Sequence, residues 1–256
     1  MRNAAPGQLA ADRALPRSPG MTPPVDWIRP ANLEAARAAQ HEIAARVETE
    51  DRLPASPALV AGVDCAGAAR GAPDRVRAMA VLLSAQARSR PLATGLVEGA
   101  PAFPYIPGFL GFREIPFVLE AVGKLPQRPD LVLVDGHGVS HPRGCGIATH
   151  LGVVLDLPTI GVAKSVLVGR LEGELGLEAG STAPLVWKGR QIATVLRSKR
   201  GVQPLFVSTG HRVSAETAVR LVMEWLAGYR LPEPTRLADR LAGEARRAAE
   251  AGEGLL

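Results

Sequence analysis

The sequence predicts an α/β protein in which a mixed β-sheet is flanked by helices. Three strand-like runs, at 58–66, 77–86 and 91–99, are separated by short turn-rich segments, which is typical of an antiparallel meander. Two further runs, "DLVLVDG" at 130–136 and "TIGVAKS" at 159–165, are apolar along most of their length and enclose a helical pattern. Apolar strands joined through a helix indicate a parallel, right-handed crossover. We therefore expect one sheet that combines a three-strand antiparallel meander with parallel strands.

The other segments alternate between helical and extended patterns. Apolar residues recur at helical spacing over about 32–49, and a second apolar stripe starts near Glu114 and stops before Pro126. A third helix opens at Ser214, a favourable N-cap residue. Extended runs occupy 183–189, 190–198 and 203–209, and the first two form a hairpin around Lys188-Gly189.

Length and composition fit a globular protein with a sizeable core and two tails. Of 256 residues, 46% are hydrophobic and 21% are charged. The formal net charge is +5 and the isoelectric point is about 9.7, which favours a polyanionic partner, although part of the charge lies in the tails. We predict a disordered N-terminal tail at 1–25, a single domain at 26–243 and a frayed C-terminal tail at 244–256.

The cysteines and the apolar runs bear on location. Cys65 and Cys145 are far apart and form no C-x-x-C motif, so a zinc site is not expected. Free thiols in a reducing cytosol are expected, with a single disulfide as the alternative. The N-terminal residues lack the apolar core of a signal peptide, and no apolar run is long enough to span a membrane. We expect a cytoplasmic protein that makes no membrane contact.

The segment "PYIPGFLGFRE" at 104–114 carries an unusual aromatic turn. Pro104 and Pro107 bracket Tyr105, and prolines so close together do not fit the interior of a helix or strand. A solvent-exposed loop would normally be more polar than this one. The residues therefore predict a stiff, apolar turn directly before the helix that starts near Glu114.

Two carboxylates interrupt or end apolar strands. Asp64 lies inside "VAGVDCAG" and Asp135 ends "LVLVDG". A carboxylate beside buried residues must be paired, hydrogen-bonded or bound to a metal. Capping of a turn is the alternative for Asp135, and interaction with a helix N-terminus is the alternative for Glu114. Together the three acids indicate a hard-cation site for Mg²⁺ or Mn²⁺, of the kind that hydrolyses phosphodiesters.

Glycines, histidines and a lysine surround these acids in the predicted fold. The loop "DGHGVSHPRGCG" at 135–146 follows a parallel strand, which is a common ligand position in α/β sheets. His137 and His141 there are candidates for ligands, acid/base groups or phosphate contacts, or are simply hydrogen-bonded side chains. Lys164 follows the next apolar strand and either faces the site or reaches solvent. His211 precedes a helix N-terminus, which favours phosphate binding.

These motifs resemble the endonuclease V family of deoxyinosine-cleaving repair nucleases. The similarity rests on "VAGVDCAG", the 103–125 segment, the 129–165 segment, "FVSTGHRVS" and "YRLPEPTRLADR", in this order, over about residues 30–240. It implies a ribonuclease H-like fold. It also implies Mg²⁺-dependent hydrolysis of the second phosphodiester bond 3′ to a deoxyinosine in DNA, with Mn²⁺ expected to substitute.

The resemblance also implies roles for individual residues. Asp64, Glu114 and Asp135 match the metal-site acids, and Lys164 and His211 match other catalytic positions. Pro104, Tyr105, Ile106 and Pro107 match the wedge that fills the space beside the lesion, where a rigid aromatic group can replace lost base stacking. The lesion-base pocket corresponds to Gly108, Leu110, Gly136, Gly138, His141, Gly146 and Ile147.

Alternatives to a DNA repair enzyme follow from the same residues. An inosine-specific endoribonuclease would use the same acids on inosine-containing RNA. A protein that binds nucleic acid without cutting it would need the fold but not the carboxylates, and all three predicted acids are present. We expect a monomer. Recognition of hypoxanthine would depend on its carbonyl acceptor and N1–H donor, which are reversed in adenine.

Overall fold

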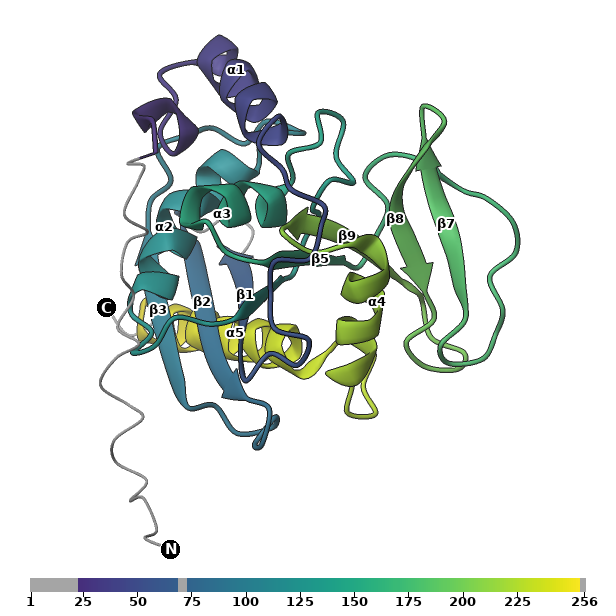
Figure 1. The fold of residues 1–256 in the computed structure, drawn as a ribbon. Helices are drawn as coiled ribbons and strands as arrows, with labels where there is room; N and C mark the ends of the chain where they lie inside the picture. The colour runs from purple at the N-terminus through teal and green to yellow at the C-terminus, as the bar shows by residue number, and fades with distance from the viewer. Residues whose placement is uncertain (1–22, 69–72, 254–256) are drawn as a thin grey trace, which may run out of the picture.

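A single mixed sheet organises the protein (Figure 1). The computed structural model describes residues 23–68 and 73–253. Nine strands pair in the order β3-β2-β1-β4-β5-β9-β8-β7-β6. The strands are β1 (Leu59–Gly67), β2 (Val76–Ser84), β3 (Ala93–Gly99), β4 (Leu131–Val134), β5 (Thr159–Ala163), β6 (Arg170–Leu171), β7 (Thr182–Trp187), β8 (Arg190–Leu196) and β9 (Leu205–His211).

The predicted strand pairings are confirmed. Strands β1, β2 and β3 form the antiparallel meander, and β1, β4 and β5 are parallel neighbours. The β7–β8 hairpin turns at Lys188 and Gly189, whose φ angles of 50° and 75° both lie in the left-handed region that tight hairpin turns require. The short edge strand β6 was not predicted, because its two exposed residues carry no periodic pattern.

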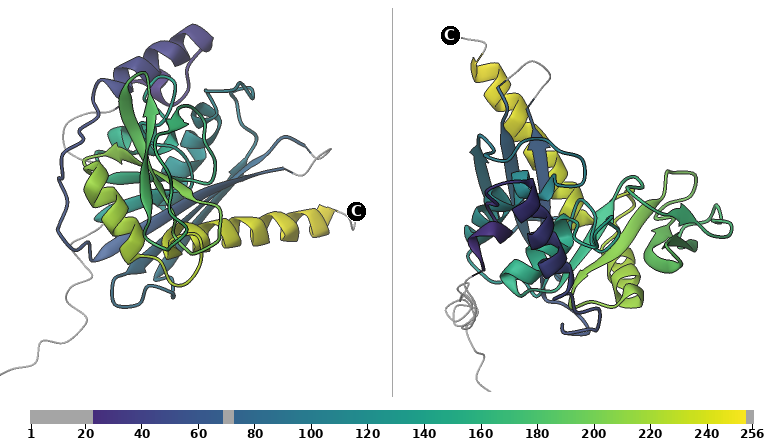
Figure 2. Two further views of the ribbon diagram at one scale, coloured as in Figure 1. Left: turned by 90° about the vertical axis from the view of Figure 1, so that its right-hand side faces the viewer. Right: turned by 90° about the horizontal axis from the view of Figure 1, so that it is seen from above.

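Helices cover both faces of this sheet (Figures 1 and 2). Helices α2 and α3 pack on one face, and α4 and α5 pack on the other. Helix α1 lies beside α3, near the N-terminal 3-10 helix η1. The bounds are η1 (Val25–Trp27), α1 (Leu33–Ala44), α2 (Gly111–Gly123), α3 (Ile147–Leu155), α4 (Ala215–Glu224) and α5 (Glu233–Glu253).

Side-chain alternation along the strands assigns residues to the two faces. In β1, Val60 belongs to the apolar cluster under α4 and α5, whereas Ala61 and Val63 belong to the cluster under α2 and α3. In β4, Leu131 and Leu133 likewise face α5. Because successive strand residues point to opposite faces, the next residues in these series, Asp64 and Asp135, are directed to the α5 face.

Helix boundaries differ from the prediction at several ends. Helix α2 begins at Gly111, three residues before Glu114, whereas its end at Gly123 agrees with the expected stop before Pro126. Helix α5 continues through 244–253, which we predicted as a frayed tail, because this segment is rich in the strong helix formers Ala, Glu and Arg. Residues 254–256 and most of the predicted tail at 1–25 lie outside the described residues.

The structure also bears on the state of the cysteines and on membrane-spanning helices. Cys65 and Cys145 are both free thiols, so the disulfide alternative is not realised. Within residues 23–68 and 73–253, none of the helices is both long and apolar enough to cross a membrane.

Candidate metal centre and nucleic-acid interface

Two of the acids come together because their strands are parallel neighbours. Val63 of β1 is the register partner of Val134 of β4, and the Asp135 amide donates to the Val63 carbonyl oxygen at 2.9 Å. Asp64 and Asp135 therefore leave adjacent strands at the same level and on the same face. Parallel strands thus convert two acids that are 71 positions apart in the chain into neighbours.

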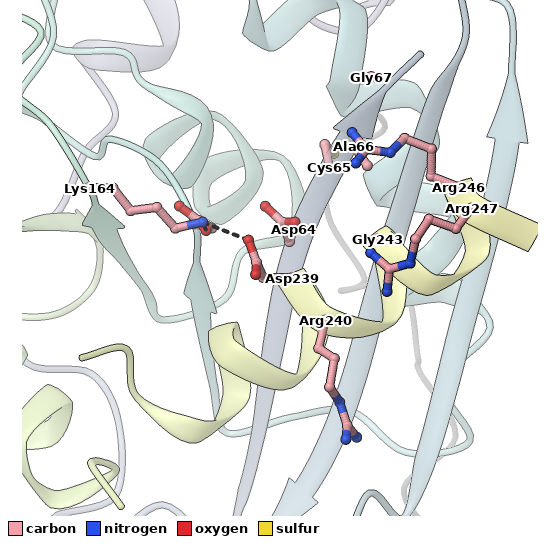
Figure 3. Close-up of a pocket in the computed structure, with 11 residues that line it drawn as sticks. Asp64, Cys65, Ala66, Gly67, Lys164, Asp239, Arg240, Gly243, Arg246 and Arg247 are labelled. Atoms are coloured by element: carbon pink, nitrogen blue, oxygen red, sulfur yellow. Dashed lines mark hydrogen bonds and ion pairs between the residues drawn. The ribbon is translucent and has the colours of Figure 1, made fainter. Parts of the chain in front are cut away.

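Helix α5 supplies a third acid, Asp239. The helix begins directly against β1, because a Cβ atom on Gly62 would lie only 1.9 Å from the Pro234 carbonyl oxygen. This close approach brings Asp239, just over one helical turn further on, to the strand ends. Carboxylate oxygens of Asp64, Asp135 and Asp239 all lie within 4.8 Å of one another (Figure 3).

Lys164 lies between two of these carboxylates. It follows β5, the parallel neighbour of β4, and its Nζ atom is 2.6 Å from Asp135 Oδ2 and 2.7 Å from Asp239 Oδ1. The contact with Asp239 has hydrogen-bond geometry, whereas the contact with Asp135 is an ion pair without such geometry. Of the two alternatives for Lys164, the structure therefore shows the one in which the side chain faces the acids.

Burial and mutual repulsion disfavour full ionisation of this cluster. Burial, followed by the charge of Asp135, raises the pKa of Asp64 to about 7. Burial also raises the pKa of Asp135, with Lys164 opposing the shift. Burial alone would lower the pKa of Lys164, but its contacts with Asp135 and Asp239 outweigh that effect and raise it. The lysine is therefore a stable cation, while the acids compete for protons.

Glu114 is near this cluster but is not one of its three members. It lies in the first turn of α2, on the opposite face of the sheet from α5. Burial, followed by the charge of Asp64, raises its pKa to about 8, so the two carboxylates influence each other. Of the predicted trio, Asp64 and Asp135 lie in the compact cluster together with Asp239, whereas Glu114 lies outside it.

His211 is not placed beside the acids. It pairs with Thr159 at the start of β5, whereas Lys164 follows the end of that strand. Five residues of extended chain span about 16 Å. His211 is buried, its Nδ1 accepts from the Glu48 amide at 3.2 Å, and burial lowers its pKa. The structure therefore places this predicted catalytic residue at the opposite end of β5, in a network of internal contacts.

The acidic cluster has the composition and spacing of a divalent-cation site. Mg²⁺, Mn²⁺ and Ca²⁺ prefer oxygen ligands at about 2.0–2.6 Å, so two ligands of one ion lie within about 5 Å of each other. The three aspartates satisfy this spacing. Asp135 Oδ2 is buried, and the cation beside it is the Lys164 ammonium group at 2.6 Å.

The acids line one end of an open pocket of about 660 Å³. Residues at the end of β1 form one wall, and α5 forms another (Figure 3). The α5 wall carries Arg240, Arg246 and Arg247 together with Gly243. A pocket with acids at one end and arginines along one side suits a ligand whose phosphates need both a cation and direct basic contacts.

The 104–107 turn projects from the protein surface. Tyr105 is 70% exposed, and Pro104 and Pro107 are also exposed, while Ile106 is partly buried against a core that includes Phe103 and Phe109. The Arg113 guanidinium lies 5.9 Å from the centre of the Tyr105 ring. The turn is therefore anchored by the buried phenylalanines on both sides and presents its tyrosine to solvent.

Three side chains form hydrogen bonds to a single carbonyl oxygen at the end of this turn. Gly108, with φ of +78°, offers its carbonyl oxygen to Gln40 Nε2 at 3.0 Å, His141 Nε2 at 3.1 Å and Arg143 Nη2 at 2.6 Å. Arg143 also stacks over Phe109 at 4.2 Å. Helix α1, which carries Gln40, and the 135–146 loop therefore fix the turn together.

His141 stabilises this arrangement through hydrogen bonds at both ring nitrogens. Its Nε2 faces a carbonyl oxygen and its Nδ1 accepts from the Arg143 amide at 3.2 Å, so the neutral tautomer with hydrogen on Nε2 satisfies both contacts. Burial, with Arg143 as a further cause, lowers the pKa of His141 to about 4. It therefore stays neutral near pH 7, with both ring nitrogens used inside the protein.

The remaining predicted base-pocket residues gather on the same loop. Gly136, with φ of +154°, lies against Ile147, whose Cγ2 atom would be 2.5 Å from a Cβ at that glycine. Side chains are also excluded at Gly138 by the Thr209 carbonyl and at Gly146 by the His137 carbonyl. The amides of Gly138 and Gly146 donate to Ser208 Oγ and the Gly138 carbonyl oxygen. Tight packing thus accounts for Gly138 and Gly146, while Leu110 is 42% exposed and Ile147 is partly buried.

His137 belongs to a polar network beneath the loop. Its Nδ1 lies 3.0 Å from Ser140 Oγ, which in turn contacts Ser208 Oγ at 3.0 Å. Burial lowers the pKa of His137 to about 4. The hydrogen-bonded alternative that we considered for this histidine therefore describes its position.

Sequence reasoning did not single out Asp239 or Gln40. Asp239 lies in "PEPTRLADR", between alanine and arginine on an amphipathic helix, where an acid is unremarkable. Gln40 is a polar residue on the buried side of α1. Gln40 could have been found from the sequence, because a polar residue in the apolar stripe of a helix needs a buried partner. Asp239 differs from other helical acids only in its contact with Asp64 and Asp135, which the sequence does not show.

Similarity to known proteins extends over most of the chain. A family model described as Endonuclease V matches residues 41–240. An Endonuclease V from Rhodospirillum centenum is 54% identical over 224 residues, which cover 87% of this chain and 92% of that protein. The crystal structure of Endonuclease V from Streptomyces avermitilis is 43% identical, with a TM-score of 0.80 over 89% of this chain and 97% of that one.

A further similar structure contains nucleic acid. It is Endonuclease V from Ciona intestinalis in complex with a 23mer DNA containing an inosine followed by a ribo-adenosine. It is 26% identical to this chain, with a TM-score of 0.73 over 85% of this chain and 98% of that one.

The sheet, the carboxylate cluster and these similarities together define a nuclease whose acidic site fits metal-dependent phosphodiester hydrolysis. Clustered carboxylates beside a lysine at the ends of parallel strands provide the chemistry, and the matched structures share the fold. The chain belongs to the Endonuclease V family.

Proposed function

We propose that this protein is a DNA repair endonuclease that recognises deoxyinosine and hydrolyses the second phosphodiester bond 3′ to it. The observation that carries the proposal is the cluster of Asp64, Asp135 and Asp239 with Lys164 in an open pocket. The Ciona intestinalis complex, with its inosine-containing DNA, supports the choice of substrate.

Mg²⁺ is the proposed cofactor, and Mn²⁺ is expected to replace it. Asp64, Asp135 and Asp239 would hold the cation, and Glu114, whose pKa is raised by burial and then by the charge of Asp64, would add negative charge nearby. When bound, such a cation activates water and stabilises the oxygen that leaves the phosphorus atom. The aspartates orient the site, and the charge of a bound cation would offset the burial and the mutual repulsion that raise the pKa values of Asp64 and Asp135.

Lys164 has a distinct role in this proposal. Its ammonium group is held by Asp135 and Asp239, and those contacts keep it protonated. A fixed cation beside the acids attracts the phosphate and stabilises charge that develops on its oxygens during hydrolysis. His211, at the other end of β5, acts through the local structure rather than at the reacting phosphate.

Lesion recognition involves the exposed turn and the loop behind it. We propose that Tyr105 enters the space left when the base leaves the stack. The base would then be received between Leu110 and Ile147, beside Gly108 and Gly136. Donors directed at the hypoxanthine carbonyl would leave the adenine amino group unpaired, which disfavours adenine.

The test uses end-labelled duplexes that each contain one inosine, in DNA and in RNA, with matched adenine controls. The proposal expects a Mg²⁺-dependent nick between the first and second nucleotides on the 3′ side of inosine in DNA. It expects no nick in the adenine duplex. The RNA arm is included because the Ciona intestinalis substrate carries a ribo-adenosine after its inosine. Faster cutting of RNA would replace the proposal with the endoribonuclease alternative, and binding without cutting would exclude both.

A further inference from the structure

Helix α5 continues beyond the region that the family model matches. The match ends at residue 240, whereas the helix extends to Glu253. Asp239, Gly243 and Arg247 follow one another at intervals of four residues, and Arg246 is three residues after Gly243. Helical residues three and four apart share one face. The extension therefore presents two arginines on the face that carries the clustered acid.

These arginines line the same pocket as the acids. Arg246 and Arg247 border it together with Asp64, Asp135 and Asp239. In Figure 3, Arg246 reaches from α5 toward the end of β1, whereas Arg240 extends away from the acids. Arg246 and Arg247 are therefore the α5 arginines best placed to meet a ligand in the pocket.

Gly243 lines the pocket between the acids and the arginines and adds no side chain to the surface of α5 there. A Cβ atom at this position would lie 3.4 Å from Arg247 Nη1, so the guanidinium rests against the helix at the glycine. No side chain of residue 243 projects into the pocket between Asp239 and Arg247. A chain of phosphates can therefore approach the helix closely at this point.

The distance along the helix suits neighbouring phosphates of one strand. Arg246 is seven residues after Asp239, which corresponds to about 10 Å of helix, or the rise of about three nucleotides in a duplex strand. A phosphate at the acidic end needs a cation, whereas phosphates along the arginine wall are neutralised directly. Guanidinium groups make paired, charge-assisted hydrogen bonds to phosphate oxygens.

We propose that Arg246 and Arg247 bind the phosphodiester backbone of the substrate strand, within about three nucleotides of the bond that is cut. The inference rests on the proposed function only in taking a nucleic acid as the substrate. Because the contact is to the backbone, it strengthens binding of damaged and undamaged DNA alike. It adds affinity and a register for the strand, not recognition of the base.

The experiment compares three proteins: wild type, Arg246→Gln/Arg247→Gln, and a control double variant, Arg52→Gln/Arg220→Gln. The control loses the same charge from two exposed arginines with acidic neighbours, neither of which lines the pocket. Affinity for inosine-containing and undamaged duplexes is measured by fluorescence anisotropy without divalent cation, so that no strand is cut, over a series of salt concentrations.

The expected result is a loss of about tenfold or more in affinity at low salt for the α5 variant, equal on both duplexes. The slope of log affinity against log salt should become shallower by about 0.9 for each lost phosphate contact. Arg246→Lys/Arg247→Lys should recover most of the affinity, and melting temperatures should match wild type. Unchanged affinity and slope, or equal losses in the control variant, would overturn the inference.

Two further observations separate this inference from the proposed function. If wild type shows no preference for inosine, the proposed lesion specificity fails, while the salt dependence on undamaged duplex still tests the arginines. If the double variant does not fold, Arg247→Gln alone, at an exposed position, provides the same measurement, with a slope change of about 0.9 expected.

Discussion

The sequence context of Asp239 and His211 does not match the position of their side chains. His211 stands in a distinctive motif, yet it is buried at the far end of β5 and bonded to the Glu48 amide. Asp239 stands in ordinary helical sequence, yet its carboxylate meets Asp64 and Asp135. At the scale of single residues, position relative to the strand ends decides chemical role.

Asp239→Asn should therefore reduce cleavage as strongly as Asp135→Asn. Loss of one oxygen charge from the cluster weakens cation binding directly. Even groups that only orient metal ligands typically contribute about 10–100-fold, so a drop of at least about 100-fold is expected. Rates are measured on an inosine duplex over a Mg²⁺ series, and partial recovery at high Mg²⁺ would support a binding defect.

His211→Asn is the matched comparison. It removes a buried ring and should lower the melting temperature, because the Glu48 amide loses its acceptor geometry. The cleavage rate of the folded variant should change much less than that of Asp239→Asn. An equal, Mg²⁺-sensitive loss in both variants would show that the assignment of roles is wrong.

At the scale of elements, the 104–107 turn combines a stiff, proline-bracketed sequence with a firm attachment to the core. Phe103 and Phe109 are buried on its two sides, and three donors converge on the Gly108 carbonyl oxygen. Only the tip is left exposed. An exposed aromatic side chain on a fixed base is suited to entering a nucleic-acid stack, because little conformational entropy remains to be lost on binding.

Tyr105→Ala should leave the melting temperature nearly unchanged, because the side chain is 70% exposed. Base–aromatic stacking contributes about 1–3 kcal/mol, so affinity for an inosine duplex should fall by about one to two orders of magnitude. The loss should be smaller for single-stranded DNA, which has no neighbouring pairs to hold open. Affinities are measured on both substrates.

Phe109→Ala provides the control within the same segment. Phe109 is buried, and its truncation should cost about 3–5 kcal/mol of stability and lower the melting temperature clearly. If Tyr105→Ala behaves like Phe109→Ala, with equal losses on both DNA substrates, then the tyrosine packs rather than inserts.

At the scale of the whole molecule, the site opposes folding when no cation is bound. The pKa of Asp64 is about 7 and that of Glu114 about 8, above the values near 4 of an unfolded chain. Between these values the folded protein binds more protons than the unfolded one. Stability from these groups is therefore present at low pH and is lost as pH rises from about 4 to about 8.

Cation binding should reverse this loss. Because a divalent cation binds the ionised carboxylates, the gain in melting temperature on adding Mg²⁺ should be small near pH 5.5 and grow toward pH 8. Melting is followed in EDTA and in Mg²⁺ across that range. Asp64→Asn should flatten the dependence, and a gain that does not vary with pH in the wild type would contradict the assignment.

The sequence by itself determined most of the sheet and two of the clustered acids. Strand-like runs separated by short turns specify β1–β3, apolar runs around a helix specify the parallel strands, and both patterns arise from neighbours along the chain. Asp64 and Asp135 were visible for the same reason, since a carboxylate in an apolar strand conflicts with its local surroundings.

The tertiary structure alone decided which other groups join them. Asp239 reaches the strand ends because Gly62 lets α5 begin against β1, a contact between segments 172 positions apart. The residues around Asp239 satisfy helix propensity whether or not an acid is needed there. Local patterns report what each segment buries, whereas a binding site depends on the distances between segments, which only packing establishes.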